Sequence, residues 1–164
     1  MRFGGHDTFH IRDGWLHKGL MLLKEEPERL VEEYASDHLG VGRNMAKAIN
    51  HWLIATGLAV KEKKAEKSRE IILRPTAFGN LVYKEDRHFI EPGTWWALHV
   101  NLLNSDEHAG SWVWFFNKFN QFRFEKSGCL ERLHRYLEQE GKRVPSNRTL
   151  ERDLSCLLNT YSRR

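Results

Sequence analysis

Apolar residues recur every three or four positions along most of the chain, a spacing that predicts a mainly α-helical fold. The first amphipathic helix is expected to begin at Trp15 and to stop near Pro27, because the residue before a proline avoids the α region. A second helix is expected from Pro27, a favoured residue of a first helical turn, to Leu39. The residues before Trp15 show no periodicity, so residues 1–26 are interpreted as an ordered N-terminal loop followed by a helix.

Residues 39–57 have the pattern of a helix-turn-helix motif, in which a glycine-bearing turn precedes a helix of about fourteen residues. The apolar face of this helix is formed by Met45, Ile49, Trp52 and Leu53. The opposite face carries polar side chains that can bind phosphates or base edges, namely Asn44, Lys47 and His51. Gly57 is expected to end the helix as a C-terminal cap.

Two short strands are expected directly after this helix, at residues 58–63 and 70–74. A segment rich in basic side chains, residues 63–69, joins the two strands. A hairpin in this position is typical of the wing of a winged helix. Residues 76–83 match the short helix that often closes such a module. The sequence therefore predicts a winged helix-turn-helix module at residues 27–84.

The composition changes after a polar connector, and residues 90–164 are predicted to form an aromatic-rich helical module. Four helices are expected in it: at residues 94–103, at residues 111–119, around Leu130–Leu137, and from the N-cap Ser146 to Tyr161. The last two have the form of a second helix-turn-helix, with Arg148 and Arg152 on its outer face. The tryptophans and phenylalanines of this module are interpreted as core residues, with stacking on the bases of a single strand as the alternative.

The formal net charge is only +4, but the positive charge is concentrated in two short segments. Residues 61–74 carry six basic and three acidic side chains, and residues 142–164 carry six basic and two acidic ones. Such clusters are the electrostatic footprint of contacts with a nucleic-acid backbone, although a solvated surface has the same composition. The side chains expected to bind DNA are Arg43, Asn44, Lys47, His51, Lys63, Lys64, Lys67, Arg69, Arg148 and Arg152. A winged helix that binds only proteins is the alternative.

Length and composition exclude several classes of protein. A chain of 164 residues is too short for a large catalytic barrel, and its apolar runs are far shorter than a membrane-spanning helix requires. The N-terminus has no apolar signal core, so we expect a cytoplasmic protein without a membrane partner. Cys129 and Cys156 have no C-x-x-C partner and are expected to be buried as small hydrophobic residues.

One compact cluster of acid, base and cationic groups lies near the N-terminus, formed by His6, Asp7 and Arg12. A base that activates water and a cation that neutralises developing charge would suit phosphodiester hydrolysis. The spacing matches no diagnostic metal motif, so we assign no metal ligands and expect a divalent metal cofactor only if the chain is a nickase. A structural loop, tied down by hydrogen bonds of His6 and Arg12, is the favoured alternative.

Several motifs are distributed over the whole chain. They are Phe3-Gly-Gly-His-Asp-Thr-Phe9 with Arg12 and Gly14-Trp-Leu16, Leu39-Gly-Val-Gly with Asn44-Met45, Thr-x-Phe-Gly at residues 76–79, Trp112-x-Trp-Phe-Phe-Asn117, and Leu-x-Arg-Asp-Leu shortly before Tyr161. Together they resemble the motifs of the SspB-like proteins of bacterial DNA phosphorothioation systems.

The resemblance implies a role in a system that places sulfur in the DNA backbone as part of phage defence. Its partners would be DNA and other phosphorothioation proteins, among them a cysteine desulfurase, a sulfurtransferase-like ATP pyrophosphatase and an ATPase. A nicking activity has been attributed to the family, and here only His6, Asp7 and Arg12 offer such chemistry. Family members often have Glu in place of Asp7 and continue well beyond the motif at Tyr161, so a nuclease site completed there would leave this chain as a DNA-binding half.

Three hypotheses therefore stand. The main one is a DNA-binding protein of a phosphorothioation system, which contacts the DNA backbone through its winged helix. The second is a DNA nickase of that system, with its site near His6, Asp7 and Arg12. The third is an adaptor that docks the modification proteins.

Overall fold

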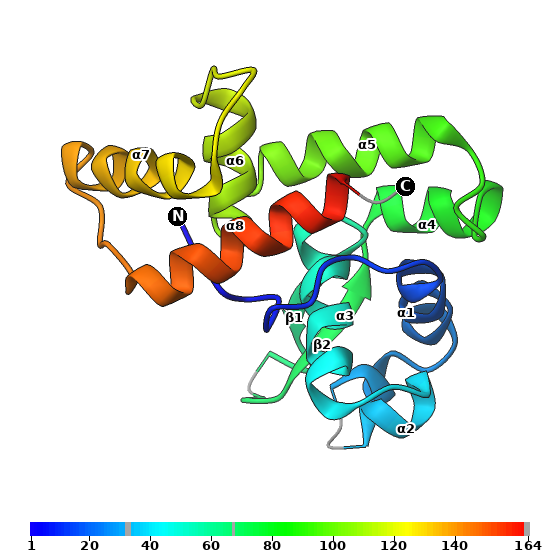
Figure 1. The fold of residues 1–164 in the computed structure, drawn as a ribbon. Coiled ribbons are helices and arrows are strands. Elements are labelled where there is room, and N and C mark those ends of the chain that lie inside the picture. Colours follow the sequence, from blue (N-terminus) through cyan, green and yellow to red (C-terminus); the bar gives the residue numbers. More distant parts are fainter. Residues whose placement is uncertain (32–33, 67, 163–164) are drawn as a thin grey trace.

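The computed structural model of residues 1–164 describes residues 1–31, 34–66 and 68–162. In these ranges the fold is mainly helical, with eight α-helices, one 3-10 helix and one two-stranded antiparallel sheet (Figure 1). In chain order the elements are α1 (Trp15–Glu25), the 3-10 helix η1 (Pro27–Leu30), α2 (Ala35–Leu39), α3 (Arg43–Ala55), β1 (Ala59–Lys63), β2 (Ile71–Pro75), α4 (Ala77–Glu85), α5 (Pro92–Leu103), α6 (Gly110–Asn117), α7 (Lys126–Gln139) and α8 (Asn147–Tyr161).

Helices α1 and α3 pack against each other through their apolar faces, as the spacing of their residues predicts. A side chain on Gly19 of α1 would meet Ile49 at 2.7 Å, so the glycine allows this close approach. At the end of α3, Gly57 adopts a left-handed φ of 75°, and the amide of Leu58 donates to the carbonyl of Leu53. The predicted C-terminal cap is thereby confirmed.

The single helix predicted from Pro27 to Leu39 is wrong. The chain forms the 3-10 helix η1 and then the short helix α2, and Val31 and Tyr34 between them are not helical. The side-chain amide of Asn50, on α3, donates to the carbonyl of Leu30. In a continuous α-helix that carbonyl would accept from the amide of Tyr34, so a tertiary contact satisfies the group that the helix would have used.

The predicted hairpin is present, within one or two residues of the expected bounds. In the antiparallel register Ala59 pairs with Pro75 and Lys63 pairs with Ile71. Helix α4 follows at once, because the Thr76 side chain accepts a hydrogen bond from the amide of Gly79 and caps the helix.

Helices α5 to α8 form the C-terminal part of the fold, close to the predicted positions. Ser146 caps α8 as expected, its side chain accepting from the amide of Thr149. Cys129 and Cys156 are buried and unbonded to each other, as predicted, and burial raises the pKa of the Cys129 thiol to about 11. Within the described residues, no helix has the length and apolar content that crossing a membrane requires.

Buried apolar residues form two cores. The larger one contains α1, α3 and the hairpin, but it also includes Leu98, Trp112 and Leu157 from the C-terminal helices. It therefore runs across the junction expected near residues 84–90. The smaller core lies between α6, α7 and α8.

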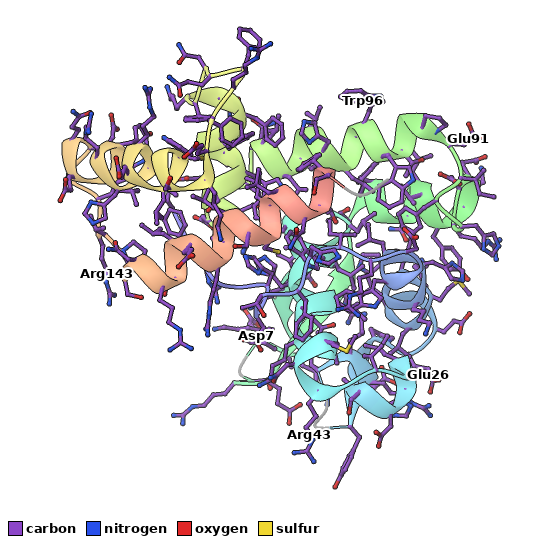
Figure 2. The ribbon with its side chains drawn as sticks, in the orientation of Figure 1. Asp7, Glu26, Arg43, Glu91, Trp96 and Arg143 are labelled. Atoms are coloured by element: carbon purple, nitrogen blue, oxygen red, sulfur yellow. The ribbon has the colours of Figure 1, made fainter. Side chains whose placement is uncertain are left out.

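The aromatic residues divide between core and surface. Trp112 and Trp114 are buried, as predicted for core residues, whereas Trp95 is 40% exposed and Trp96 is 69% exposed. Trp96 lies at the outer edge of the molecule on α5 (Figure 2).

Candidate nucleic-acid interface

A groove of about 890 Å³ lies between α3 and the hairpin, and we call it the α3 groove. Its other walls come from η1, α2, the loop before α6 and the N-terminal strap, by which we mean residues 1–9. Its polar lining consists of Arg2, Ser36, Arg43, Asn44, Lys47, Asn50, His51, Lys61 and His108. None of the described residues that line it is acidic, so the groove offers a continuous site for an anion.

The first turn of α3 supplies the outer wall of this groove. Arg43, Asn44 and Lys47 are all exposed, because they lie on the side of the helix opposite its buried residues, such as Ala46 and Ile49. Gly42 precedes the helix without a side-chain cap, so the first backbone amides of α3 keep their hydrogen-bonding capacity for a ligand. Arg43 lies at the lower edge of the molecule in Figure 2. These three residues were predicted to bind DNA, and the structure brings them together.

His51 was predicted to share their exposed face, and this orientation is wrong. Only 9% of His51 is exposed, because Gly5 of the strap lies against its ring: a side chain on Gly5 would meet the ring at 2.6 Å. Burial lowers the pKa of His51 to about 3, and the nearby His6, His108, Arg2 and Lys61 lower it further. His51 therefore forms a neutral floor of the α3 groove, where the helical pattern predicted a projecting polar group.

The lowered pKa of His51 predicts a pH-dependent stability. The unfolded chain takes up a proton near pH 6.5, whereas folded His51 resists it down to about pH 3. This contribution to stability is therefore complete above pH 6.5 and is lost as the pH falls, with a limiting slope of roughly 1.4 kcal/mol per pH unit. Urea denaturation from pH 7 to pH 4 should show a steeper loss for the native sequence than for His51→Gln. A His38→Gln variant, which removes an exposed histidine, should keep the steep dependence, and equal slopes for all three proteins would contradict the assignment.

Three basic residues line the groove without having been predicted as DNA-binding residues: Arg2, Lys61 and His108. Arg2 is held at the groove by two backbone hydrogen bonds. Its amide donates to the Asp106 carbonyl and its carbonyl accepts from the Gly110 amide, each at 3.0 Å. His51 and His108 lie 6.5 Å apart between ring centroids. These contacts join segments far apart in the chain, so no local pattern predicts them. Only Lys61, within the basic segment 61–74, had a sequence signal.

The tip of the hairpin, whose basic residues were predicted to contact phosphate, lies outside the lining of the α3 groove. Lys63, Lys64 and Arg69 are exposed there and do not line the groove, and Lys64 is paired with Glu70 at 2.8 Å. This pairing lowers the pKa of the Glu70 carboxyl. Lys67 lies outside the described residues. A role for these lysines and for Arg69 in phosphate contacts stays a prediction.

Arg148 and Arg152 lie one turn apart on α8, and both are exposed, as predicted. They do not line the α3 groove. Their contact with DNA also stays a prediction.

His6 is enclosed at the centre of the molecule. It is 2% exposed, its ring stacks on Trp52 at 5.6 Å between centroids, and its Nε2 atom lies 3.0 Å from Oδ1 of Asp153 on α8. The same carboxylate accepts hydrogen bonds from the Gly4 amide and from the Ser111 hydroxyl. His6 and Asp153 therefore fasten the strap to α6 and α8, which agrees with a structural role for this loop.

Asp7 and Arg12, the other members of the predicted catalytic cluster, lie elsewhere. Asp7 is exposed, with a left-handed φ of 53° (Figure 2). The Arg12 guanidinium lies over the rings of Phe9 and Trp15, at 5.6 and 5.2 Å from their centroids. Among the described residues, no hydrogen bond or ion pair joins either of them to His6. Their catalytic roles stay a prediction.

Similarity to known proteins extends over nearly the whole chain. A family model described as "Protein of unknown function (DUF4007)" matches residues 3–164. The chain belongs to the DUF4007 family. The match covers all the helices and strands of this DUF4007 chain, and among curated proteins none matches it.

Two crystal structures of SspB share the fold of this DUF4007 chain. A magnesium-bound SspB structure has a TM-score of 0.84 and 29% identity over 97% of this chain, and a second SspB structure has a TM-score of 0.84 and 28% identity over 97%. The resemblance to the SspB-like family is thereby confirmed. The chain spans 48% and 49% of the two SspB chains, and the matching part is their N-terminal half.

The magnesium ion of one SspB structure raises the question of a metal site in this chain. No group of three His, Cys, Asp or Glu side chains in the described residues is arranged to hold a metal ion. We therefore assign no magnesium ligands in this chain, and no step of the proposed function involves a metal.

Proposed function

We propose that this chain binds double-stranded DNA through the α3 groove, as a component of a DNA phosphorothioation system. The observation that carries the proposal is the absence of acidic lining in the part of the groove that the structure describes, where Arg2, Arg43, Lys47 and Lys61 converge from three separate segments. Four cations around one groove repel each other unless an anion is bound, and DNA is the polyanion that such a groove accommodates.

The arrangement of elements supports the same proposal. Helices α1, α2 and α3 followed by a hairpin have the order of a winged helix, whose third helix enters the major groove with its N-terminal residues. Here those residues are Arg43, Asn44 and Lys47, the exposed part of α3. Asn44 can read an adenine edge, and the two cations can hold phosphates or a guanine. The exposed Lys63 and Arg69 of the wing would add phosphate contacts.

The similarity to SspB supports the phosphorothioation context, in which other proteins of the system would be partners. Nicking is less well supported by the geometry. A general base must reach solvent and substrate, whereas His6 is buried and bound to Asp153.

The test is the salt dependence of duplex binding, measured by fluorescence anisotropy with a labelled DNA duplex of about two helical turns. Each phosphate contact contributes roughly −0.9 to the slope of log affinity against log salt. Lys47→Ala should weaken binding at low salt and reduce the slope by about one contact, on all duplex sequences alike. Lys84→Ala, which removes an exposed lysine of α4 paired with Glu85, is the matched control and should bind like the native protein.

Two results would count against duplex binding by the α3 groove. One is an affinity that does not change with salt. The other is an equal slope for the native protein and for a variant that combines Arg43→Ala, Lys47→Ala and Lys61→Ala. Loss of binding in Arg148→Ala or Arg152→Ala alone would move the interface to α8.

A further inference from the structure

A second basic surface lies at the junction of α6 and α7, on a part of the molecule that the proposed function does not use. A pocket of about 210 Å³ is formed there, and we call it the α6–α7 pocket. Its cationic side chains are Lys118, Arg132 and Arg135, and its aromatic ones are Trp114, Phe119 and Tyr136. Asn120 and Gln139 complete it, so no side chain of the described lining is acidic.

The three cations of this pocket are available to an anionic ligand. None of them takes part in an ion pair among the described residues, and Lys118, Arg132 and Arg135 are all exposed. Arg132 has a neutral neighbour: when the Gln121 amide is turned so that its oxygen faces the guanidinium, that oxygen accepts from Arg132 at 2.7 Å. A neutral partner positions the arginine without neutralising its charge.

Directly after Gln121 the loop presents Phe122, whose side chain is fully exposed at 103%. The loop itself is anchored, because the ring of Phe124 packs edge-on against Phe119 and Phe115, at 5.1 and 5.5 Å between centroids. Residues 117–124 include no acidic side chain, and Arg123 directly follows Phe122 in the sequence. An anchored loop thus holds an exposed aromatic ring two residues after Asn120, which lines the cationic pocket.

We propose that a segment of single-stranded nucleic acid binds at the α6–α7 pocket. Phosphates contact Lys118, Arg132 and Arg135, and a base stacks on Phe122. The amides of Asn120 and Gln139 are donors and acceptors for a base edge. Aromatic rings that stack bases beside cations that follow the backbone are the general means by which proteins bind single strands.

This site is separate from the α3 groove. In Figure 1 the loop between α6 and α7 lies at the top of the molecule, and the hairpin tip and α2 lie at the bottom. Arg43 and that loop are likewise at opposite edges of Figure 2. A short duplex bound in the α3 groove therefore leaves the α6–α7 pocket open, and the proposal does not depend on duplex binding.

The test measures binding of a short labelled oligo-dT by fluorescence anisotropy at low salt. Phe122→Ala should weaken binding about 5- to 100-fold, the effect of removing one stacking platform, and Phe122→Trp should retain it. A variant with Arg132→Ala and Arg135→Ala should bind more weakly and show a shallower salt dependence, by roughly 0.7 for each phosphate that it no longer binds. Arg143→Ala, an exposed arginine between α7 and α8, is the control and should bind like the native protein.

Each of the following outcomes would overturn the proposal. One is that the native protein fails to bind the oligonucleotide, and another is that Phe122→Ala binds it as well as the native protein. A third is loss of binding in a variant that combines Arg43→Ala and Lys47→Ala, which would place the strand in the α3 groove. Displacement by poly-glutamate at equal charge concentration would assign the pocket to an acidic protein. Because Phe122 is exposed, Phe122→Ala should leave duplex binding and the unfolding midpoint unchanged, so a failure to fold does not obscure the result.

Discussion

Replacing Asp153 with alanine should lower the free energy of unfolding by about 3–5 kcal/mol, the largest loss expected for a single polar side chain of this protein. The carboxylate is 1% exposed. It accepts from the Gly4 amide at 2.6 Å and from the Ser111 hydroxyl at 2.8 Å, and it lies 3.0 Å from Nε2 of His6. Alanine would leave His6 and the Ser111 hydroxyl buried without this partner, and it would remove the acceptor of the Gly4 amide.

Urea denaturation followed by tryptophan fluorescence measures this loss. Asp153→Asn keeps the shape and one acceptor oxygen, so it should lose less than Asp153→Ala. Glu151→Ala, two residues earlier on the exposed face of α8, should change the free energy of unfolding by no more than about 0.5 kcal/mol. A loss below about 1 kcal/mol for Asp153→Ala would show that Asp153 does not hold the strap in place.

The role of Asp153 shows where a local pattern misleads. His6 and Asp7 are neighbours in the sequence and suggested one chemical cluster, yet the partner of His6 lies 147 residues away. A carboxylate on the last helix could not be assigned to the first loop from spacing alone. The function of the contact follows from the fold: it fastens the strap whose residues Arg2 and Gly5 then form one wall of the α3 groove.

The elements themselves were largely predictable, because helical periodicity, caps and glycine turns are local properties. Gly57 and Ser146 mark the ends of helices in the sequence as they do in the structure. The exceptions have tertiary causes. Asn50 takes the carbonyl of Leu30 and interrupts the helix predicted there. His51 lies at a polar position of α3 but is covered by Gly5 of the N-terminal strap.

The same distinction applies to the candidate site. Arg43, Asn44 and Lys47 could be predicted because they follow one another on a single helix face. Arg2 and His108 could not, since they reach the groove through a strap and a loop that the sequence leaves unplaced. The proposed function depends on the absence of acidic side chains from the described lining of the groove. This absence is a property of the assembled fold and of no single segment.

Gly79→Ala should be among the most destabilising of the small substitutions, with an expected loss of about 3 kcal/mol, near the upper end for overpacking. A side chain at this position would lie against the carbonyl oxygen of Leu58, well inside van der Waals contact. That oxygen cannot move aside, because it accepts from the Thr76 amide at 3.0 Å where the hairpin joins α4. The Thr-x-Phe-Gly motif therefore has a steric reason: Thr76 caps α4, and Gly79 lets α4 pack directly against the backbone of Leu58, between α3 and β1.

The controls for Gly79→Ala are two other helical glycines, Gly93 of α5 and Gly128 of α7. A side chain at either would meet nothing within 4 Å. Alanine there only lowers the entropy of the unfolded chain and improves helix propensity, so Gly93→Ala and Gly128→Ala should be neutral or stabilising by up to about 1 kcal/mol. Thermal and urea denaturation should therefore show a loss of stability for Gly79→Ala, and no change or a gain for the chemically identical substitutions at Gly93 and Gly128. If all three variants shift the midpoint alike, the close approach of α4 to Leu58 is not the cause of the loss, and the hairpin that borders the α3 groove is held in place by other contacts.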